Sequence, residues 1–233
     1  MTDAYRAERG AGSEARVQQF VQQVYGWMAA ALALTGFVAL AVSRSAAMQR
    51  FIFGTPFVFF GLIIGELLLV MWLATRIGRM SASTATTVFV GYSVLNGLTL
   101  SSIFLVYAEA TIAQTFFVTA GVFGVMTLYG FFTKTDLTRM GNILGMALLG
   151  FIIASLVNLF LRSEGLYWLI TYAGVAIFTG LVAYDSQRIK EMALAGAGEG
   201  EQGQKYAIMG ALRLYLDFVN LFLLLLRIFG RRR

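Results

Sequence analysis

The stretch ALRLYLDFVNLFLLLLRIFG at residues 211–230 is apolar enough to cross a bilayer, yet its first half carries two charged side chains. Arg213, Asp217 and Asn220 follow one another at intervals of four and three residues, which places them on one face of a helix. A charge at mid-bilayer costs at least about 2.5–3.5 kcal/mol, so this face should point into a helix bundle or a wet cavity. An alternative is an internal Arg213–Asp217 salt bridge that only lets the helix insert.

The composition of the whole chain is that of a membrane protein. Of its 233 residues, 58% are hydrophobic and 13% are charged, and the mean hydropathy is +0.74. A soluble domain has about 25% charged and about 45–50% apolar residues, so the surplus apolar surface must face lipid. We therefore expect an all-α polytopic membrane protein that contacts the lipid bilayer.

The order of apolar and polar segments predicts seven transmembrane helices. The chain has seven apolar runs of sufficient length: 24–42, 56–74, 84–107, 112–132, 140–161, 166–184 and 206–229. The first run is too long for the apolar core of a signal peptide. Thr55 is expected to cap the second helix, with Pro56 at its first position. We expect an N-terminal cytoplasmic tail over 1–22, one transmembrane domain over 23–233, and a flexible glycine-rich loop over 186–204.

The residue types that are missing exclude several kinds of site. The chain has no histidine and no cysteine, so zinc sites of the Cys/His type, thiol nucleophiles and Ser–His–Asp triads are excluded. Sensing of pH would have to use carboxylates instead of histidine. We expect no enzymatic activity and no cofactor; acid-only proteolysis by paired aspartates is the remaining enzymatic alternative. The net charge is +6, but the Lys and Arg residues lie between the apolar runs, as topology signals do, so no nucleic-acid partner is expected.

The distribution of Lys and Arg predicts the orientation. With the N-terminus inside, ten of these residues lie on the inner side and seven on the outer side, four of the seven at 227–233. The loops favour a cytoplasmic N-terminus, whereas the C-terminal tail opposes it. We expect seven crossings; the alternative is that the last segment returns to the cytoplasm.

Other polar and small residues inside the spans are candidates for function or packing. Glu66 lies near the middle of the second span and is either part of an ion pathway or a carboxylate that holds two helices together. Arg76 and Asp185 end the second and sixth spans on the same side, where they can pair. Three residues are expected to make hydrogen bonds between helices: Asn96, Thr99 and Asn158. Two GxxxG pairs are expected to pack closely: Gly61 with Gly65 and Gly141 with Gly145.

Four stretches together resemble the Bax inhibitor family, also called the transmembrane BAX inhibitor motif family, and its bacterial branch in particular. They are AYDSQRIK at 183–190, residues 211–230, VYGWMAAALALTG at 24–36 and GLTLSSIF at 97–104. The resemblance implies a bundle of seven helices with the last enclosed by the other six, in the bacterial inner (plasma) membrane. It also implies a calcium leak that is governed by pH.

The resemblance assigns roles to particular residues. Asp185 and Asp217 match the family's pH-sensing aspartate pair, and Arg76 matches its latch. Glu66 matches the acidic residue of the second span. Arg213 departs from the pattern: an arginine one turn from Asp217 favours the ionised carboxylate and is expected to shift or abolish the pH response.

These residues predict a pH-sensitive calcium leak channel. Two carboxylates in one low-dielectric site titrate as a unit, and Ca²⁺ prefers hard oxygen ligands, so Asp185 and Asp217 are candidate transient ligands for the permeant ion. Arg213 and Asn220 are expected to modulate or line the pathway. One alternative is an interaction partner of a membrane-embedded protease in membrane-protein quality control. Another is a proton-coupled transporter, which an internal repeat would favour.

Overall fold

The computed structural model describes residues 2–197 and 200–230, with side chains from Ala15 onward. Within these residues every regular element is helical, and seven helices are long and apolar enough to cross a membrane: Ala15–Ser43, Pro56–Arg79, Ala82–Val106, Glu109–Phe132, Thr138–Leu161, Glu164–Leu194 and Gly200–Phe229. The prediction of an all-α protein with seven spans is confirmed. Parts of three expectations lie outside the described residues: the first residue of the tail, residues 198–199 of the loop, and Arg231–Arg233 of the charge count.

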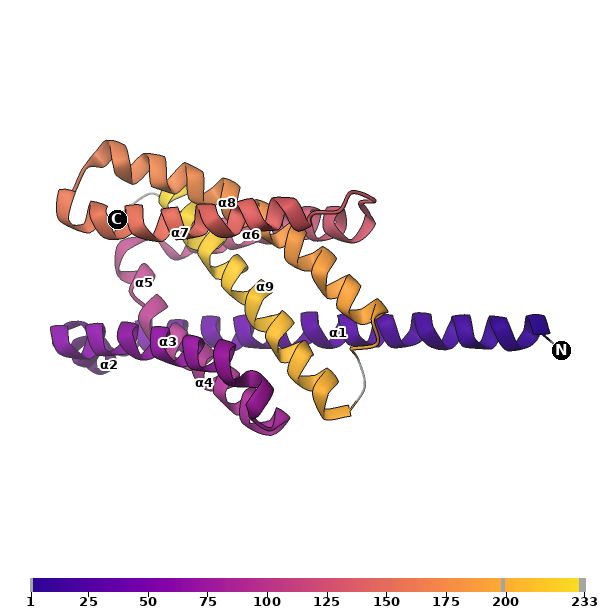
Figure 1. Cartoon of the computed structure of the whole chain (residues 1–233). Coiled ribbons are helices and arrows are strands. Elements are labelled where there is room, and N and C mark those ends of the chain that lie inside the picture. Colours follow the sequence, from indigo (N-terminus) through magenta and orange to yellow (C-terminus); the bar gives the residue numbers. More distant parts are fainter. Residues whose placement is uncertain (1, 198–199, 231–233) are drawn as a thin grey trace. The chain divides into compact units, whose positions relative to one another are not determined.

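The helices follow one another with short connections (Figure 1). Their bounds are α1 Thr2–Ser43, α2 Ala46–Phe53, α3 Pro56–Arg76, the 3-10 turn η1 Ile77–Arg79, α4 Ala82–Leu100, α5 Ile103–Val106, α6 Glu109–Phe132, α7 Thr138–Leu161, α8 Glu164–Leu194 and α9 Gly200–Phe229. The tail is part of α1, so the first helix begins well before its apolar segment.

Three boundaries differ from the sequence prediction. The expected loop at 186–204 is too wide, because α8 continues to Leu194 and α9 begins at Gly200. The third run is interrupted after α4, where Ser101 and Ser102 donate their hydroxyls to carbonyls three residues earlier and so compete with the helix. Thr55 does occupy the cap position before Pro56, but its side chain makes no capping hydrogen bond.

The described helices form two compact units. The first contains α1 to α5 together with Lys190–Tyr215, and the second contains Tyr107–Ile189 and the chain from Leu216 onward. Helix α9 therefore contributes to both. It is also the most buried helix: 72% of its most apolar stretch is buried, against at most 44% in any other span.

In the first unit, α1 and α4 lie close together. A Cβ atom added at Gly97 of α4 would lie 2.8 Å from the carbonyl oxygen of Thr35 and 2.7 Å from Cβ of Val38. Only a residue without a side chain allows the two backbones to approach in this way. This contact brings the polar residues in the middle of α4 next to α1.

In the second unit, α8 and α9 share an apolar cluster. Its buried members are Ile177, Phe178, Leu181, Leu221, Leu224 and Leu225. Helix α6 approaches α8 closely at Gly130, where a Cβ atom would lie 2.2 Å from the carbonyl oxygen of Ala183. Helix α7 does so at Gly141, which lies against the ring of Tyr184.

The packing expected of the GxxxG pairs is therefore confirmed only for Gly141. A Cβ atom at Gly61, Gly65 or Gly145 would have no neighbour within 4 Å among the described residues. The physical reason is that α3 and α7 are the least buried spans. Their glycines lie on faces that carry apolar side chains toward lipid.

Candidate functional site

Asp185 and Asp217 are both buried, with exposed fractions of 8% and 5%. Asp185 is one helical turn after Leu181, and Asp217 is one turn before Leu221, on the helix faces that form the apolar cluster of the second unit. Because α8 and α9 are consecutive helices that run in opposite directions, both steps lead to the same end of the cluster. This register places the two carboxylates at one level of the α8–α9 packing.

The segment around Asp185 is fixed to the loop between α6 and α7. The side-chain oxygen of Gln187 accepts a hydrogen bond from the backbone N–H of Leu137, and its amide nitrogen donates to the carbonyl oxygen of Thr135, both at 2.8 Å. Gln187 is itself buried. It satisfies a backbone donor and a backbone acceptor of the loop, so that any displacement of this part of α8 must break these bonds or move the loop.

The same loop contains Asp136, which lies between the spans at 109–132 and 138–161. Asp136 accepts a hydrogen bond from the backbone N–H of Thr138 at 2.8 Å. Hydrogen bonds from the Thr138 side chain and backbone hold the pKa of Asp136 below its usual range, because they favour the charged form.

Arg213 and Asn220, which share the polar face with Asp217, are half-buried. The amide nitrogen of Asn220 donates to the carbonyl oxygen of Leu216 in its own helix at 2.8 Å. The part of the prediction that places Asp217 away from lipid is in line with its burial. The role of Asn220 in a pathway stays a prediction.

Arg76, the expected latch, ends α3 in the first unit and is exposed. Asp185 belongs to the second unit. The Arg76–Asp185 pair therefore stays a prediction.

Glu66 holds α3 to α4. One carboxylate oxygen accepts a hydrogen bond from the hydroxyl of Thr99, and the other accepts one from the amide nitrogen of Asn96 at 3.3 Å. The expected interhelical role of Asn96 and Thr99 is thus confirmed. Asn158 differs: its side-chain oxygen accepts from the backbone N–H of Ser163 and so closes the turn between α7 and α8.

The contacts of Glu66 continue into a buried chain of hydrogen bonds. The hydroxyl of Tyr215 in α9 donates to the side-chain oxygen of Asn96 at 3.1 Å and lies 2.7 Å from the hydroxyl of Thr35 in α1. The hydroxyl of Thr35 also lies 2.9 Å from the carbonyl oxygen of Ser93. The chain from Thr35 through Tyr215 and Asn96 to Glu66 connects four helical segments of the first unit.

Sequence reasoning missed two members of these networks. Tyr215 lies two residues before Asp217, in a stretch whose pattern is dominated by its charged residues, so the buried hydrogen bonds of its hydroxyl group were not predicted. Thr35 is the single serine or threonine in the first apolar run, 24–42. A hydroxyl residue inside a long apolar run is the signal that could have identified it, because lipid offers no hydrogen-bond partner.

The expected calcium ligands do not form a closed metal site. Among the side chains of residues 15–197 and 200–230, no three acidic groups lie close enough together to hold one metal ion. Asp185 and Asp217 thus provide carboxylate oxygens at one level of the second unit without a third acid beside them.

Comparison with known proteins agrees with this architecture. The sequence profile of the family described as "Inhibitor of apoptosis-promoting Bax1" matches residues 17–233. The "Inner membrane protein YbhL" of Escherichia coli K12 is 53% identical over 94% of both chains. A protein of Borreliella burgdorferi is 45% identical over 92% of this chain and 93% of its own. A membrane protein of Streptococcus pyogenes serotype M1 is 37% identical over 94% of this chain and 95% of its own. The chain therefore belongs to the Bax inhibitor family and is a multi-pass integral membrane protein.

Proposed function

We propose that this protein is a pH-sensitive calcium leak channel of the bacterial inner membrane, with its N-terminus in the cytoplasm. The observation that carries the proposal is the burial of Asp185 and Asp217 at one level of the α8–α9 packing. Two carboxylates in a low-dielectric site cannot both ionise cheaply, so they titrate as a pair. Such a pair supplies a pH switch in a chain without histidine.

The gate in this proposal is the end of α8. In the closed state the ionised pair attracts Arg76, which ties the end of α3 to the end of α8. Protonation removes this attraction and frees the segment that contains Gln187. The hydrogen bonds of Gln187 to the loop at 135–137 then transmit the movement of α8 to the connection between α6 and α7.

The permeant ion in this proposal is Ca²⁺, and no resident metal is required. Carboxylate oxygens are the hard ligands that Ca²⁺ prefers. Two of them, without a third acid beside them, bind weakly enough for the ion to leave, which conduction requires. Asp217 also attracts the cation to the level of the gate.

Arg213 sets the pH threshold. It lies one turn before Asp217 in α9, where its positive charge favours the ionised carboxylate and opposes protonation of the pair. Replacement by serine removes this charge and moves the response to higher pH.

The test is calcium flux into liposomes that contain the purified chain, measured between pH 8 and 5. Flux of the native protein should rise as the pH falls through about 6–7, by at most about tenfold per pH unit for one titrating group. Asp185→Asn should give a leak that does not depend on pH, and Arg213→Ser should displace the curve to higher pH. Glu109→Gln is the control, because this exposed carboxylate at the start of α6 should leave the curve unchanged.

The proposal fails if the native curve and the Asp185→Asn curve are parallel. It also fails if liposomes with protein take up no more calcium than empty liposomes at any pH. The second result would favour the alternative of an interaction partner for a membrane protease.

A further inference from the structure

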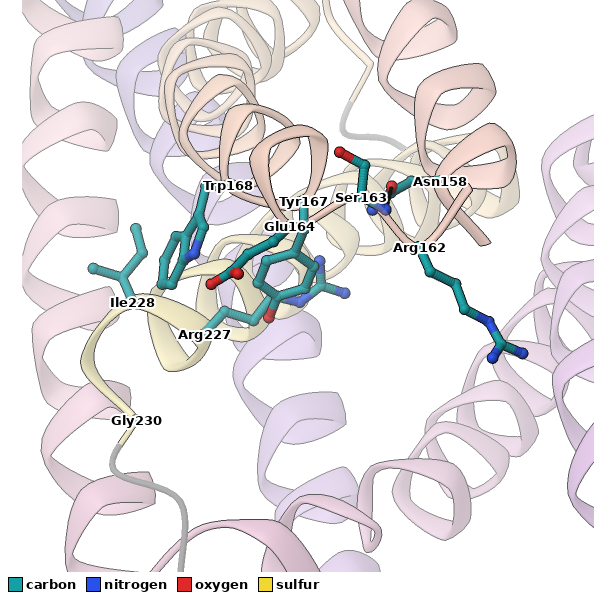
Figure 2. A pocket seen from close by; sticks show the side chains of 9 residues that line it. All are labelled: Asn158, Arg162, Ser163, Glu164, Tyr167, Trp168, Arg227, Ile228 and Gly230. Carbon is teal, nitrogen blue, oxygen red and sulfur yellow. Dashed lines mark hydrogen bonds between the residues drawn. The ribbon is translucent and has the colours of Figure 1, made fainter. Parts of the chain in front are cut away.

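The second unit contains a hollow of about 500 Å³ where α7 and α9 end and α8 begins (Figure 2). Its lining includes charged, amide, hydroxyl and aromatic side chains. Because successive spans alternate in direction, the ends of the fifth and seventh spans and the start of the sixth lie on the same side of the membrane. The hollow is therefore at a membrane–water interface, the level of the lipid headgroups.

One side of the hollow presents a positive charge that is already oriented. The guanidinium carbon of Arg227 lies 5.5 Å from the ring centroid of Tyr167, and Figure 2 shows the two groups one over the other. An arginine that stacks its flat face on a ring keeps its N–H groups at the edge of the plane for a ligand. This edge suits the two free oxygens of a phosphodiester.

Two neutral groups can add to this anion site. The side-chain oxygen of Asn158 accepts the backbone N–H of Ser163, which turns its amide nitrogen away from that bond. The hydroxyl oxygen of Ser163 accepts the backbone N–H of Leu166, so its own hydrogen remains to be donated. Both residues line the hollow together with Arg227.

The other side of the hollow presents a negative charge and an aromatic ring. Figure 2 shows the Glu164 carboxylate and the indole of Trp168 on the side of Tyr167 opposite Ser163. Trp168 is held by its neighbours, since it stacks on Tyr172 with ring centroids 5.8 Å apart. A carboxylate beside a tryptophan is a good partner for an ammonium group.

Glu164 and Arg227 are two of the three charged residues that line the hollow; the third, Arg162, extends away from them in Figure 2. Glu164 and Arg227 both lie in the described part of the chain, and there they are not joined in an ion pair. A single anion would be repelled by Glu164, and a single cation would be repelled by Arg227. A ligand that carries a phosphate and an ammonium group a short distance apart would satisfy both.

We propose that this hollow binds the headgroup of a phosphoethanolamine lipid, with the phosphate at Arg227 and the ammonium at Glu164 and Trp168. The general enrichment of Trp and Tyr at membrane interfaces explains aromatic residues there. It does not explain why an acid and an arginine line the same hollow without pairing. The inference does not depend on the proposed calcium leak.

The test is lipid binding to the full chain in detergent, measured by native mass spectrometry with phosphatidylethanolamine and phosphatidylglycerol. The native protein should retain phosphatidylethanolamine in preference. Arg227→Gln should weaken binding of both lipids by about tenfold or more, because a charged hydrogen bond is lost. Glu164→Gln should weaken the binding of phosphatidylethanolamine by a similar factor. The binding of phosphatidylglycerol should stay the same or become tighter.

The chain offers a matched control for each substitution. Arg50 is an exposed arginine in the last turn of α2, and Glu109 is the exposed first residue of α6, as Glu164 is of α8. Neither residue lines the hollow. Arg50→Gln and Glu109→Gln should keep native affinity and preference.

Three results would overturn the proposal: equal binding of the two lipids by the native chain, an equal loss in Arg227→Gln and Arg50→Gln, or no effect of Glu164→Gln on phosphatidylethanolamine. Soluble glycerophosphoethanolamine should compete poorly, because it lacks the acyl chains that hold a lipid at this level. Displacement of the lipid at equal concentration would instead identify a soluble ligand. A gain for phosphatidylglycerol in Glu164→Gln cannot result from misfolding, which keeps the test decisive.

Discussion

The two units bury carboxylates in different ways. In the first unit, each oxygen of Glu66 accepts a hydrogen bond from a neutral donor of α4, and the chain of donors continues through Tyr215 to α1. In the second unit, Asp185 and Asp217 stand one turn from a cluster that is entirely apolar. The first arrangement joins helices through polar bonds. The second places two buried carboxylates beside an apolar cluster.

The comparison suggests which contacts hold each unit together. Close helix approach in the second unit depends on glycines at the level of the aspartates, such as Gly130 against Ala183. In the first unit, α1 and α4 approach closely at Gly97, and polar side chains bridge the helices in addition. Substitutions that attack either feature should therefore affect different properties.

The largest effect is expected from Gly130→Val. The new Cβ atom would lie 2.2 Å from the carbonyl oxygen of Ala183, so α6 and α8 must move apart next to Asp185. Overpacking of this kind costs about 1–3 kcal/mol or more. Thermal unfolding in detergent should show the loss, and the pH curve of calcium flux should be distorted.

Gly124→Val is the matched control for this prediction. Gly124 lies in the same helix, and a Cβ atom there would have nothing within 4 Å among the described residues. Its melting temperature should stay close to that of the native chain. Equal melting temperatures for Gly130→Val and the native protein would show that α6 and α8 are not in close contact.

The second effect concerns the polar chain of the first unit. Tyr215→Phe removes the hydroxyl between Thr35 and Asn96 and leaves both without this partner in a buried site. Loss of a buried partner costs about 1–3 kcal/mol, which thermal unfolding should detect. The pH dependence of calcium flux should remain, because the aspartate pair is untouched. Tyr206→Phe, at an exposed position of the same helix, should change neither property.

If calcium flux depended less on pH in Tyr215→Phe than in the native chain, the proposed difference between the two units would be contradicted. It would mean that the hydrogen-bonded chain ending at Glu66 takes part in the pH response. The two units would then differ in structure and not in function.

The third effect tests the expected latch. Arg76→Ala should raise calcium flux at neutral pH several-fold, because the closed state loses its ion pair. An ion pair at a surface contributes about 0.2–1 kcal/mol of stabilisation, and breaking a buried pair costs more. Arg79→Ala is the control, since Arg79 is an exposed arginine three residues further along, in η1. Unchanged flux in Arg76→Ala, or an equal rise in Arg79→Ala, would remove the latch from the mechanism.

How much of this arrangement could be predicted from the sequence depends on what each residue contacts. The seven spans and the exclusion of Asp217 from lipid follow from composition and helical spacing. The register of Asp185 with Asp217 does not, because it depends on how α8 packs against α9 at Leu181 and Leu221. The role of Gln187 depends on a loop fifty residues earlier in the chain, to which no local pattern points.

Packing of small residues was also only partly predictable. A GxxxG spacing shows that a helix has a flat face, but it does not show whether a second helix packs against that face. Gly141 meets Tyr184, whereas Gly65 meets nothing within 4 Å among the described residues. Gly130, where a Cβ atom would lie 2.2 Å from the carbonyl oxygen of Ala183, stands outside both GxxxG pairs.

The smallest effect is expected at Asp136, which lies outside the membrane in the loop that Gln187 holds. Hydrogen bonds from Thr138 hold the pKa of Asp136 below its usual value of 3.8. A carboxylate whose pKa is lower in the folded than in the unfolded protein stabilises the fold above its usual pKa, and this contribution disappears as the pH falls through the lower value. The native chain should thus melt slightly above Asp136→Asn at pH 7, by about 1 °C or less for an exposed group. The difference should shrink as the pH falls below 3.8, and it should also be smaller in a Thr138→Val background, which lacks the hydroxyl donor. A difference that persists unchanged in acid would show that the carboxylate stabilises the loop through shape and not through charge.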